Sequence, residues 1–484
     1  MPFLNARLSM DCSARYLGMG VSRADLARSF WRDISNLLLR KRMGRAVMAR
    51  SFWIKGIGMD RAELTVGDAL AGMRAIDPQI KKYADLVVRK GVHVQPGQEV
   101  VVQGPVETAD FVRKLVASAY AAGAGHVTVI WSDDTVTRLT YENVDLSWFE
   151  NTPEWQRVQL NSLAEAGACF IYVEGTDPEA LKHIDPAKPA ARSKAVNTQC
   201  EVYRHNLDFN MNPWCIAGAP VKAWARQVYP GVPDEVAVYK LWLAILAAAR
   251  ADGEDPESDW ELHNAGFEKN LRFLNGHHFD ALHYTASNGT DLTVGMTDKH
   301  LWAGGAGYTP EGRAFFPNIP TEEVFTSPDR LRVNGVVHSA LPLVHNGTKI
   351  DRFWFRFENG RVVDYDAKVG KEMLTSILET DEGARYLGEA ALISKNTPIR
   401  ESKTLFYDTL YDENASCHLA LGLGFAECYE GGYDMTVDEL LEHGVNSSAT
   451  HVDFMIGTDD MDITGICKDG TEVPVFVNGQ WTWE

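Results

Sequence analysis

Hydrophobic positions in the first half of the chain alternate between helical spacing and short continuous runs. Apolar residues recur at helical spacing over residues 80–88 up to Gly91, which predicts an amphipathic helix ended by a glycine. The apolar run 100–102 follows a Pro-Gly turn pair and is typical of a buried parallel strand. The chain therefore begins its clear periodicity with a helix and then a strand.

The same alternation continues for about seventy residues. It predicts a helix over 111–119, a strand over 126–131, a helix over 155–166 and a strand over 169–173. A β-α-β-α-β order of this kind favours an α/β domain with a doubly wound parallel sheet. We assign residues 76–285 to this N-terminal α/β domain.

Residues 286–484 show a different pattern. Phenylalanine alternates with other residues over 353–357, directly before the turn pair Asn359-Gly360, and similar pairs recur at 469–470 and 478–479. Such pairs between alternating segments are typical of β-hairpins. We therefore expect a C-terminal α+β domain rich in antiparallel sheet.

The first 75 residues differ in charge from the rest. They hold 13 lysines and arginines against six acids, whereas the whole chain has a net charge of -19. Transit peptides are also Arg-rich and acid-poor, but Asp25 and Asp33 interrupt that pattern. We interpret residues 1–75 as an atypical basic extension, either loosely ordered or upstream of a natural start at Met73.

Composition narrows the class of protein. The 484 residues are 45% apolar, enough for a large core, and the net charge of -19 argues against nucleic-acid or anionic-membrane binding. Seven cysteines occur singly, without Cys-x-x-Cys spacing, so neither a disulfide framework nor a zinc knuckle is indicated. No run of about 18 apolar residues predicts a transmembrane helix. We expect a cytoplasmic protein.

His451 and Asp453 are the most informative pair. In a strand, residues i and i+2 point to the same face, so an imidazole and a carboxylate lie side by side. Two other segments place such groups among small or apolar neighbours, around Glu389 and His418, where unpaired charges would be costly to bury. A bound cation would remove that cost.

Further carboxylates complete the candidate set. Glu413 lies five residues before His418, and Glu322 and Glu323 end a Pro-rich turn. Carboxylates and imidazoles without paired thiolates suit zinc, cobalt or manganese acting in hydrolysis. Six ligands, four of them carboxylates, exceed the needs of one tetrahedral zinc, so we expect two metal ions bridged by a carboxylate.

Other candidate sites are weaker. The glycine-rich residues 304–307 do not follow a strand with the spacing of a dinucleotide-binding fingerprint. We interpret them as a flexible loop. Cys417 lacks a partner to lower its pKa, because His418 is assigned to the metals. The pair 277–278 is assigned a surface or structural role, and Trp214 and Trp224 are assigned to the core.

Four motifs resemble those of the metallo-aminopeptidase family that contains aminopeptidases T, S and II. The resemblance spans roughly Ile80 to the C-terminus. The motifs are Pro-Asn-Ile-Pro-Thr-Glu-Glu-Val-Phe-Thr (317–326), Leu-Gly-Glu-Ala-Ala-Leu (387–392), Asp-Glu-Asn-Ala-Ser-Cys-His-Leu-Ala-Leu-Gly (412–422) and His-Val-Asp-Phe-Met-Ile-Gly (451–457).

The resemblance implies a dimeric, two-metal exopeptidase that removes N-terminal residues from short peptides, with the site in an internal cavity bordered by both domains. It implies Glu389 as the bridging carboxylate. Glu322 stays open as an alternative ligand, and the spare carboxylate of its pair is expected to act as a base or to support a ligand. The implied metal ligands are Glu323, Glu389, Glu413, His418, His451 and Asp453.

One position departs from the family pattern. The family places a tyrosine seven residues after the histidine of the third motif, and here that residue is Phe425. The missing phenol favours an alternative in which the protein binds metal without catalysis. A metal-dependent amidohydrolase acting on a non-peptide amide is the other alternative, because it would use the same residues.

Overall fold

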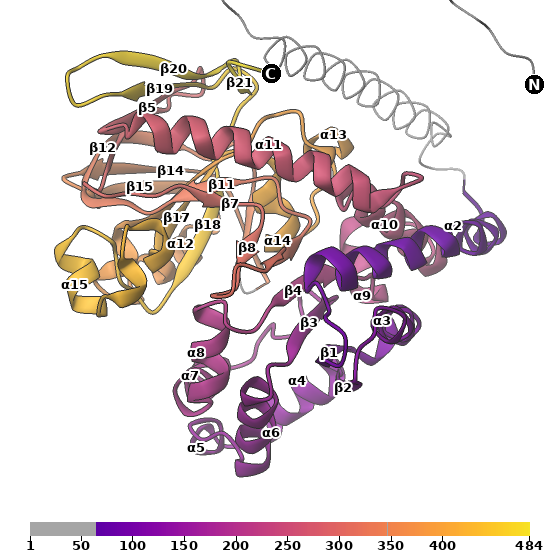
Figure 1. Cartoon of the computed structure of the whole chain (residues 1–484). Coiled ribbons are helices and arrows are strands. Elements are labelled where there is room, and N and C mark those ends of the chain that lie inside the picture. Colours follow the sequence, from indigo (N-terminus) through magenta and orange to yellow (C-terminus); the bar gives the residue numbers. More distant parts are fainter. Residues whose placement is uncertain (1–63, 346) are drawn as a thin grey trace, which may run out of the picture. The chain divides into compact units, whose positions relative to one another are not determined.

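The computed structural model describes residues 64–345 and 347–484 (Figure 1). Most of the basic extension assigned from the sequence, residues 1–63, lies outside the described residues. The described chain contains one parallel sheet and three antiparallel sheets. The predicted combination of parallel and antiparallel sheet is therefore confirmed.

Helix α2 (Val66–Leu86) begins earlier than the hydrophobic periodicity predicted. The Thr65 side chain accepts a hydrogen bond from the Asp68 backbone at 3.2 Å, and the Asp68 carboxylate accepts one from the Thr65 backbone at 3.1 Å. This capping box fixes the start of the helix. Before Ile76 only Ala69 is buried, so the first turns carry no apolar stripe to mark them. Met73 lies inside this helix.

The parallel sheet contains the strands expected in the first half. They are β1 (Glu99–Pro105), β2 (His126–Ser132), β3 (Cys169–Glu174) and β4 (Trp214–Gly218). The strand order is β10-β4-β3-β1-β2, so the chain adds strands on both sides of β1. The fifth strand, β10 (Asn318–Ile319), comes from the second half of the chain and pairs with β4.

Helices pack around this sheet (Figure 1). The apolar stripe of α3 packs its Phe111 against Tyr83 of α2, with ring centroids 5.2 Å apart. After α2 the chain forms a short π-helix, η1 (Val87–Gly91), which ends at the predicted glycine. The remaining helices are α3 (Ala109–Ala121), α4 (Asp134–Asn143), α5 (Leu146–Phe149), α6 (Glu154–Glu165), α7 (Ala187–Gln199), α8 (Glu201–Asp208), α9 (Lys222–Val228), α10 (Asp234–Ala248) and α11 (Pro256–His277).

A nine-stranded antiparallel sheet forms much of the second half. Its predicted hairpin turn has positive φ angles at Asn359 (50°) and Gly360 (83°), which a type I′ turn requires. The strands are β5 (Ala281–Thr285), β6 (Asp291–Met296), β12 (Pro328–His338), β13 (Leu343–His345), β14 (Thr348–Glu358), β15 (Arg361–Val369), β19 (Asp462–Ile466), β20 (Glu472–Val477) and β21 (Gln480–Trp481).

A five-stranded antiparallel sheet, which we call the ligand sheet, carries most of the candidate metal ligands. Its order is β18-β17-β16-β11-β7. One apolar core, including Phe353, Phe355 and Phe454, holds it against the nine-stranded sheet. Its strands are β7 (Ala303–Gly304), β11 (Val324–Thr326), β16 (Leu387–Leu392), β17 (His418–Gly422) and β18 (His451–Met455).

Short elements complete the second half. The helix predicted around 373–378 is α12 (Lys371–Leu378). No helix in the described ranges is long and apolar enough to cross a bilayer. The other elements are β8 (Gly307–Tyr308), β9 (Ala314–Phe315), α13 (Pro398–Ser402), α14 (Thr409–Asp412) and α15 (Val437–Glu442), with single 3-10 turns between them.

Candidate metal centre

Strand register places the candidate ligands on one face of the ligand sheet. Glu389 on β16 pairs with Ala420 on β17, and Ala420 pairs with Asp453 on β18. His418 precedes Ala420 by two residues and His451 precedes Asp453 by two, so each points to the same face as its neighbour. The small Ala420 side chain leaves the space between the two carboxylates open.

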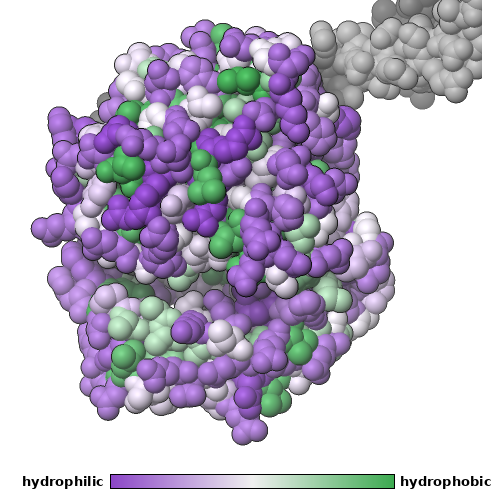
Figure 2. Space-filling view, turned by 90° about the vertical axis from the view of Figure 1, so that its left-hand side faces the viewer, coloured by the Kyte–Doolittle hydropathy of each residue, from purple (hydrophilic) through white to green (hydrophobic). Residues whose placement is uncertain are grey.

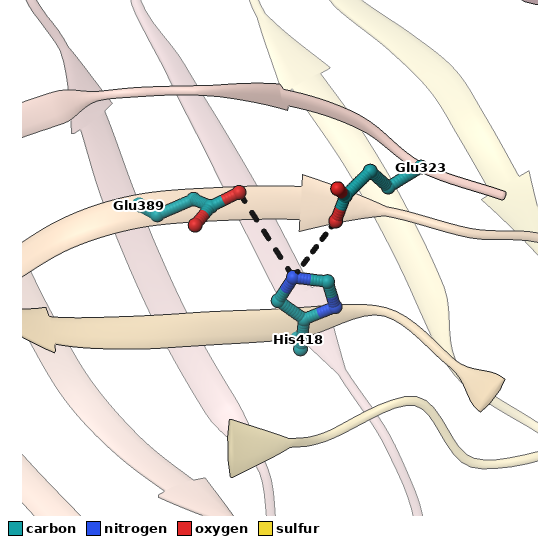
Figure 3. A group of neighbouring side chains, drawn as sticks. All are labelled: Glu323, Glu389 and His418. Atoms are coloured by element: carbon teal, nitrogen blue, oxygen red, sulfur yellow. Dashed lines mark ion pairs between the residues drawn. The ribbon is translucent and has the colours of Figure 1, made fainter. Parts of the chain in front are cut away.

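The side chains converge at short distances. The His418 Nε2 atom lies 3.1 Å from Glu323 Oε2 and 3.9 Å from Glu389 Oε1 (Figure 3). The His451 Nε2 atom lies 3.1 Å from Glu389 Oε2 and 3.2 Å from Asp453 Oδ1. Glu389 therefore directs one oxygen toward each imidazole.

Two groups of three side chains offer ligand atoms that all lie within 4.8 Å of one another. One group is Glu323, Glu389 and His418, and the other is Glu389, His451 and Asp453. Glu389 belongs to both groups. This is the arrangement that a carboxylate bridging two cations would need.

Backbone carbonyls orient both imidazoles. His418 Nδ1 donates to the Glu413 carbonyl at 3.0 Å, and His451 Nδ1 donates to the Leu423 carbonyl at 2.7 Å. Because a carbonyl oxygen only accepts, each Nδ1 carries a proton and each Nε2 faces the carboxylates. A metal-binding histidine is held in the same way by a hydrogen bond to its other nitrogen.

Burial and mutual repulsion shift the pKa values of this cluster. Burial raises the pKa of Glu389 to about 7, with a further rise from Glu323 and Asp453, although the hydrogen bond from His451 opposes it. Burial, Asp453 and Glu323 raise the pKa of Glu413 well above its usual value. Burial would lower the pKa of His418, but Glu323, Glu389 and Asp453 outweigh it and raise this pKa to about 10.

The shifted pKa values indicate whether these residues suit divalent cations. Four carboxylates and two imidazoles lie together, Glu413 and His451 half-buried and the other four buried, and protons on His418 and His451 offset the negative charge. Divalent cations would offset the same charge and accept all the ligand atoms at once. The donor set is all oxygen and nitrogen, which suits zinc, cobalt or manganese. The residues present fit the implied metals.

The cluster opens into a cavity of about 670 Å³. Residues from both halves of the chain line it, including Tyr172 and Trp214 from the parallel-sheet region and Glu413 from the second half. The space-filling view in Figure 2 shows a furrow across the face of the molecule that is turned toward the viewer. The proposed ligands therefore lie in the wall of a space that a small molecule can enter.

Glu322 lies apart from the cluster. Its carboxylate pairs with Arg250, with 2.8 Å between Glu322 Oε2 and Arg250 Nη2, and lies 3.7 Å from His263 Nε2. It is not among the residues that line the cavity. Of the two adjacent glutamates, the structure brings Glu323 to the cluster and gives Glu322 an arginine partner.

Phe425, at the position where the family has tyrosine, lies beside the cluster. Its ring centroid is 5.0 Å from that of His451 and 5.5 Å from that of Phe325. It lines the cavity, so the absent hydroxyl belongs to the space next to the ligands.

The structure gives residues 304–307 and Trp214 a different place from the one expected from the sequence. The segment 304–307, interpreted from the sequence as a flexible loop, contributes to β7 and β8 and lines the cavity. Gly304 has a φ of 142°, and a Cβ there would lie 2.5 Å from the Glu323 carbonyl oxygen, so glycine allows β7 to approach β11. Trp214 was assigned to the core but lines the cavity, whereas Trp224 is buried as expected.

Cys417 has the properties of a core thiol. It is 2% exposed, and burial raises its pKa to about 12. Its Sγ donates to the Ile393 carbonyl at 3.3 Å. These contacts agree with the expectation that it is no nucleophile.

The matching family profile and the similar curated proteins are all peptidases. The profile of the thermophilic metalloprotease (M29) family matches residues 76–481. The chain is 44% identical to aminopeptidase AmpS of Bacillus subtilis over 411 residues, covering 85% of this chain and all of that protein. It is 41% identical to aminopeptidase T of Thermus aquaticus, covering 84% of this chain and all of that protein.

A solved structure extends this similarity to the fold. The structure of wild-type AmpT from Thermus thermophilus matches with a TM-score of 0.78 and 39% sequence identity. The match covers 84% of this chain and all of that one.

Proposed function

The chain belongs to the thermophilic metalloprotease (M29) family, and from this premise we propose that it uses two divalent metal ions to release N-terminal amino acids from short peptides. It is a metallo-aminopeptidase, as the family and its aminopeptidase relatives indicate. The number of ions and the preference for short peptides are our proposals. The number of ions rests on the two groups of candidate ligands that share Glu389, and the preference for short peptides rests on the cavity that they line.

We assign six metal ligands. Glu323, Glu389 and His418 would hold one ion, and Glu389, His451 and Asp453 would hold the other. Glu413 lines the same cavity, and the negative charges of Asp453 and Glu323 help to raise its pKa, so we include it as the sixth ligand.

In the proposed chemistry the metal ions and the side chains have different tasks. When bound, divalent ions polarise the scissile carbonyl and make a water molecule more acidic. Glu389 lies in both ligand groups, and we propose that it would hold the two ions against the substrate, while a carboxylate of the cluster accepts the water proton and passes it to the leaving amine. Glu322 is held by Arg250 and is assigned instead to fix the backbone next to Glu323.

The cavity favours exopeptidase action. The free α-amino group of a peptide is a cation, and the carboxylate-rich wall attracts it. A chain end can enter a cavity of about 670 Å³ more readily than the middle of a folded chain can.

Three further expectations stay as proposals. We propose that residues 76–285 and 286–484 are two domains, although β5 and β10 cross that boundary in their strand pairing. We propose a homodimer, as the family resemblance implies. We also propose a cytoplasmic location, because the six described cysteines are free thiols.

The function is tested by metal removal and return. The protein is chelated, zinc, cobalt or manganese is added back, and a panel of aminoacyl-p-nitroanilides, N-acetylated peptides and non-peptide amides is assayed. We expect activity on free-amine substrates to vanish with chelator and to return with two metal equivalents per chain. Activity that resists complete metal removal, or equal cleavage of N-acetylated peptides, contradicts the proposal, and a preference for non-peptide amides favours an amidohydrolase.

A further inference from the structure

One arginine lies in the wall of the cavity that holds the metal cluster. Arg204 is on α8, and among the described lining residues it is the only lysine or arginine. It pairs with Asp208 one helical turn later, and its side chain is 35% exposed. The lining also contains the His418 and His451 imidazoles and six carboxylic acids: Asp208, Glu323, Glu389, Glu413, Glu427 and Asp453.

Two phenols lie near this arginine. The Tyr172 and Tyr203 hydroxyl oxygens are 2.5 Å apart, so one of their two protons joins them and one is left to donate elsewhere. Burial and the contact with Tyr203 raise the pKa of Tyr172 well above its usual value, and the positive charge of Arg204 opposes this rise. Both phenols therefore keep their protons at neutral pH and act as neutral donors.

Helix α8 borders the same space as the second half of the chain. The ring of Phe209, directly after α8, lies 5.4 Å from the ring of Tyr433, and Tyr433 lines the cavity. Arg204, Tyr172 and Tyr203 thus face a cavity whose other wall carries the metal cluster.

We propose that Arg204, with the spare proton of the Tyr172–Tyr203 pair, binds the C-terminal carboxylate of a short peptide substrate. This inference rests on the proposed aminopeptidase function. A short peptide carries a cationic amine and an anionic carboxylate, and the cavity offers a carboxylate-rich wall for the first and one guanidinium for the second. A guanidinium has five N–H donors, so Arg204 keeps Asp208 as a partner while it binds a second carboxylate.

The consequence is selection by substrate length and by the chemistry of the C-terminus. A charge-assisted hydrogen bond from arginine to carboxylate favours the free acid over the amide of the same peptide by about tenfold or more. Because this contact is remote from the scissile bond and is made equally in ground and transition states, it lowers KM and leaves kcat largely unaffected.

The test compares matched peptides. Peptides of two, three and four residues, beginning with the residue that the p-nitroanilide panel cleaves best, are assayed as free acids and as C-terminal amides on metal-loaded protein. We expect an acid-to-amide ratio in kcat/KM of about ten or more at one length, carried by KM. In Arg204→Ala that ratio falls toward one, and in Arg204→Lys part of it remains.

Controls separate this inference from the proposed function. Arg113→Ala removes an exposed arginine that pairs with Asp110, and it is expected to keep the wild-type ratio. A wild-type ratio near one at every length, or a ratio that Arg204→Ala leaves unchanged, overturns the inference even if p-nitroanilides are cleaved. Failure to cleave any p-nitroanilide with metal present contradicts the proposed function instead.

Discussion

At the level of single residues, Glu389 directs its two carboxylate oxygens to imidazoles on two neighbouring strands. The distances are 3.9 Å to His418 and 3.1 Å to His451. Its side chain is 6% exposed, so the charge has little access to water. Because Glu389 belongs to both groups of candidate ligands, we expect its substitution to disturb the proposed centre more than that of any other ligand.

Glu389→Gln should lower kcat/KM by about a hundredfold or more, because changes to residues that merely support metal ligands already cost 10–100-fold. Metal content per chain should fall as well. Steady-state kinetics on an aminoacyl-p-nitroanilide and elemental analysis measure both. Glu382→Gln is the matched control, since Glu382 is 70% exposed and pairs with Arg361; wild-type metal content in Glu389→Gln would rule out the shared-ligand role.

Phe425→Tyr should raise kcat, because it places a phenol beside His451, where the family resemblance implies one. A single hydrogen-bond donor to a developing oxyanion is worth roughly 10²–10³ in rate, so we expect a rise of about tenfold or more with little change in KM. Phe325→Tyr, whose ring lies 5.5 Å from that of Phe425, controls for adding a hydroxyl nearby. An unchanged or lower kcat would show that this chain does not use a phenol there.

At the level of elements, the ligand sheet is fixed by contacts that lie outside it. The pair of Arg250 and Glu322 joins the chain just after α10 to the residues just before β11, and its side chains are 12% and 4% exposed. The Glu322 backbone also donates to Asn414 at 2.7 Å, next to Glu413. Glu322 therefore holds the segment of Glu323 twice, through its carboxylate to Arg250 and through its backbone N–H to the segment of Glu413.

Arg250→Ala should destabilise the fold by about 3–5 kcal/mol, because it leaves the Glu322 charge buried without its partner. Chemical denaturation of wild type and variant gives the free energy of unfolding. Arg226→Ala removes one partner of an exposed ion pair with Asp234 and should change this free energy by about 1 kcal/mol or less. Equal effects of the two substitutions would argue against a structural role of the Arg250–Glu322 pair.

At the level of the whole molecule, the cavity joins the two halves of the described chain. The parallel sheet contributes Tyr172 and Trp214, and the second half contributes the candidate metal ligands. Strand β10 extends from the second half into the parallel sheet, which ties the halves together by backbone hydrogen bonds. A site with this construction depends on the entire described fold.

Metal affinity should increase with pH. In the metal-free protein the pKa of His418 is raised to about 10, so its imidazole is protonated at pH 8 and must lose that proton to bind metal. Below about pH 7 Glu389 is protonated too, and affinity should fall more steeply. Calorimetric titration of zinc at pH 6, 7, 8 and 9, in buffers with different ionisation enthalpies, measures affinity and proton release. Affinity independent of pH, or no proton release at pH 8, would contradict this prediction.

Much of the centre was predictable because some relations are local. The side chains of His451 and Asp453 share a face in any strand, and the two residues do lie on a strand, β18. The turn at Asn359-Gly360 was equally predictable, because both residues tolerate positive φ. By contrast, the early start of α2 was missed because capping, and no apolar stripe, defines its first turns.

Tertiary structure alone decided the rest. Glu322 and Glu323 are adjacent glutamates that the sequence alone does not distinguish. They differ because Arg250, 72 residues away in sequence, forms an ion pair with Glu322. Strand register brings Glu389 and Asp453 to either side of Ala420, and no local pattern encodes that register. Arg204 likewise shares a cavity with the candidate metal ligands only after both halves fold. Sequence determined which side chains each strand presents, because direction alternates locally; packing determined which of them meet, because contact depends on distant segments.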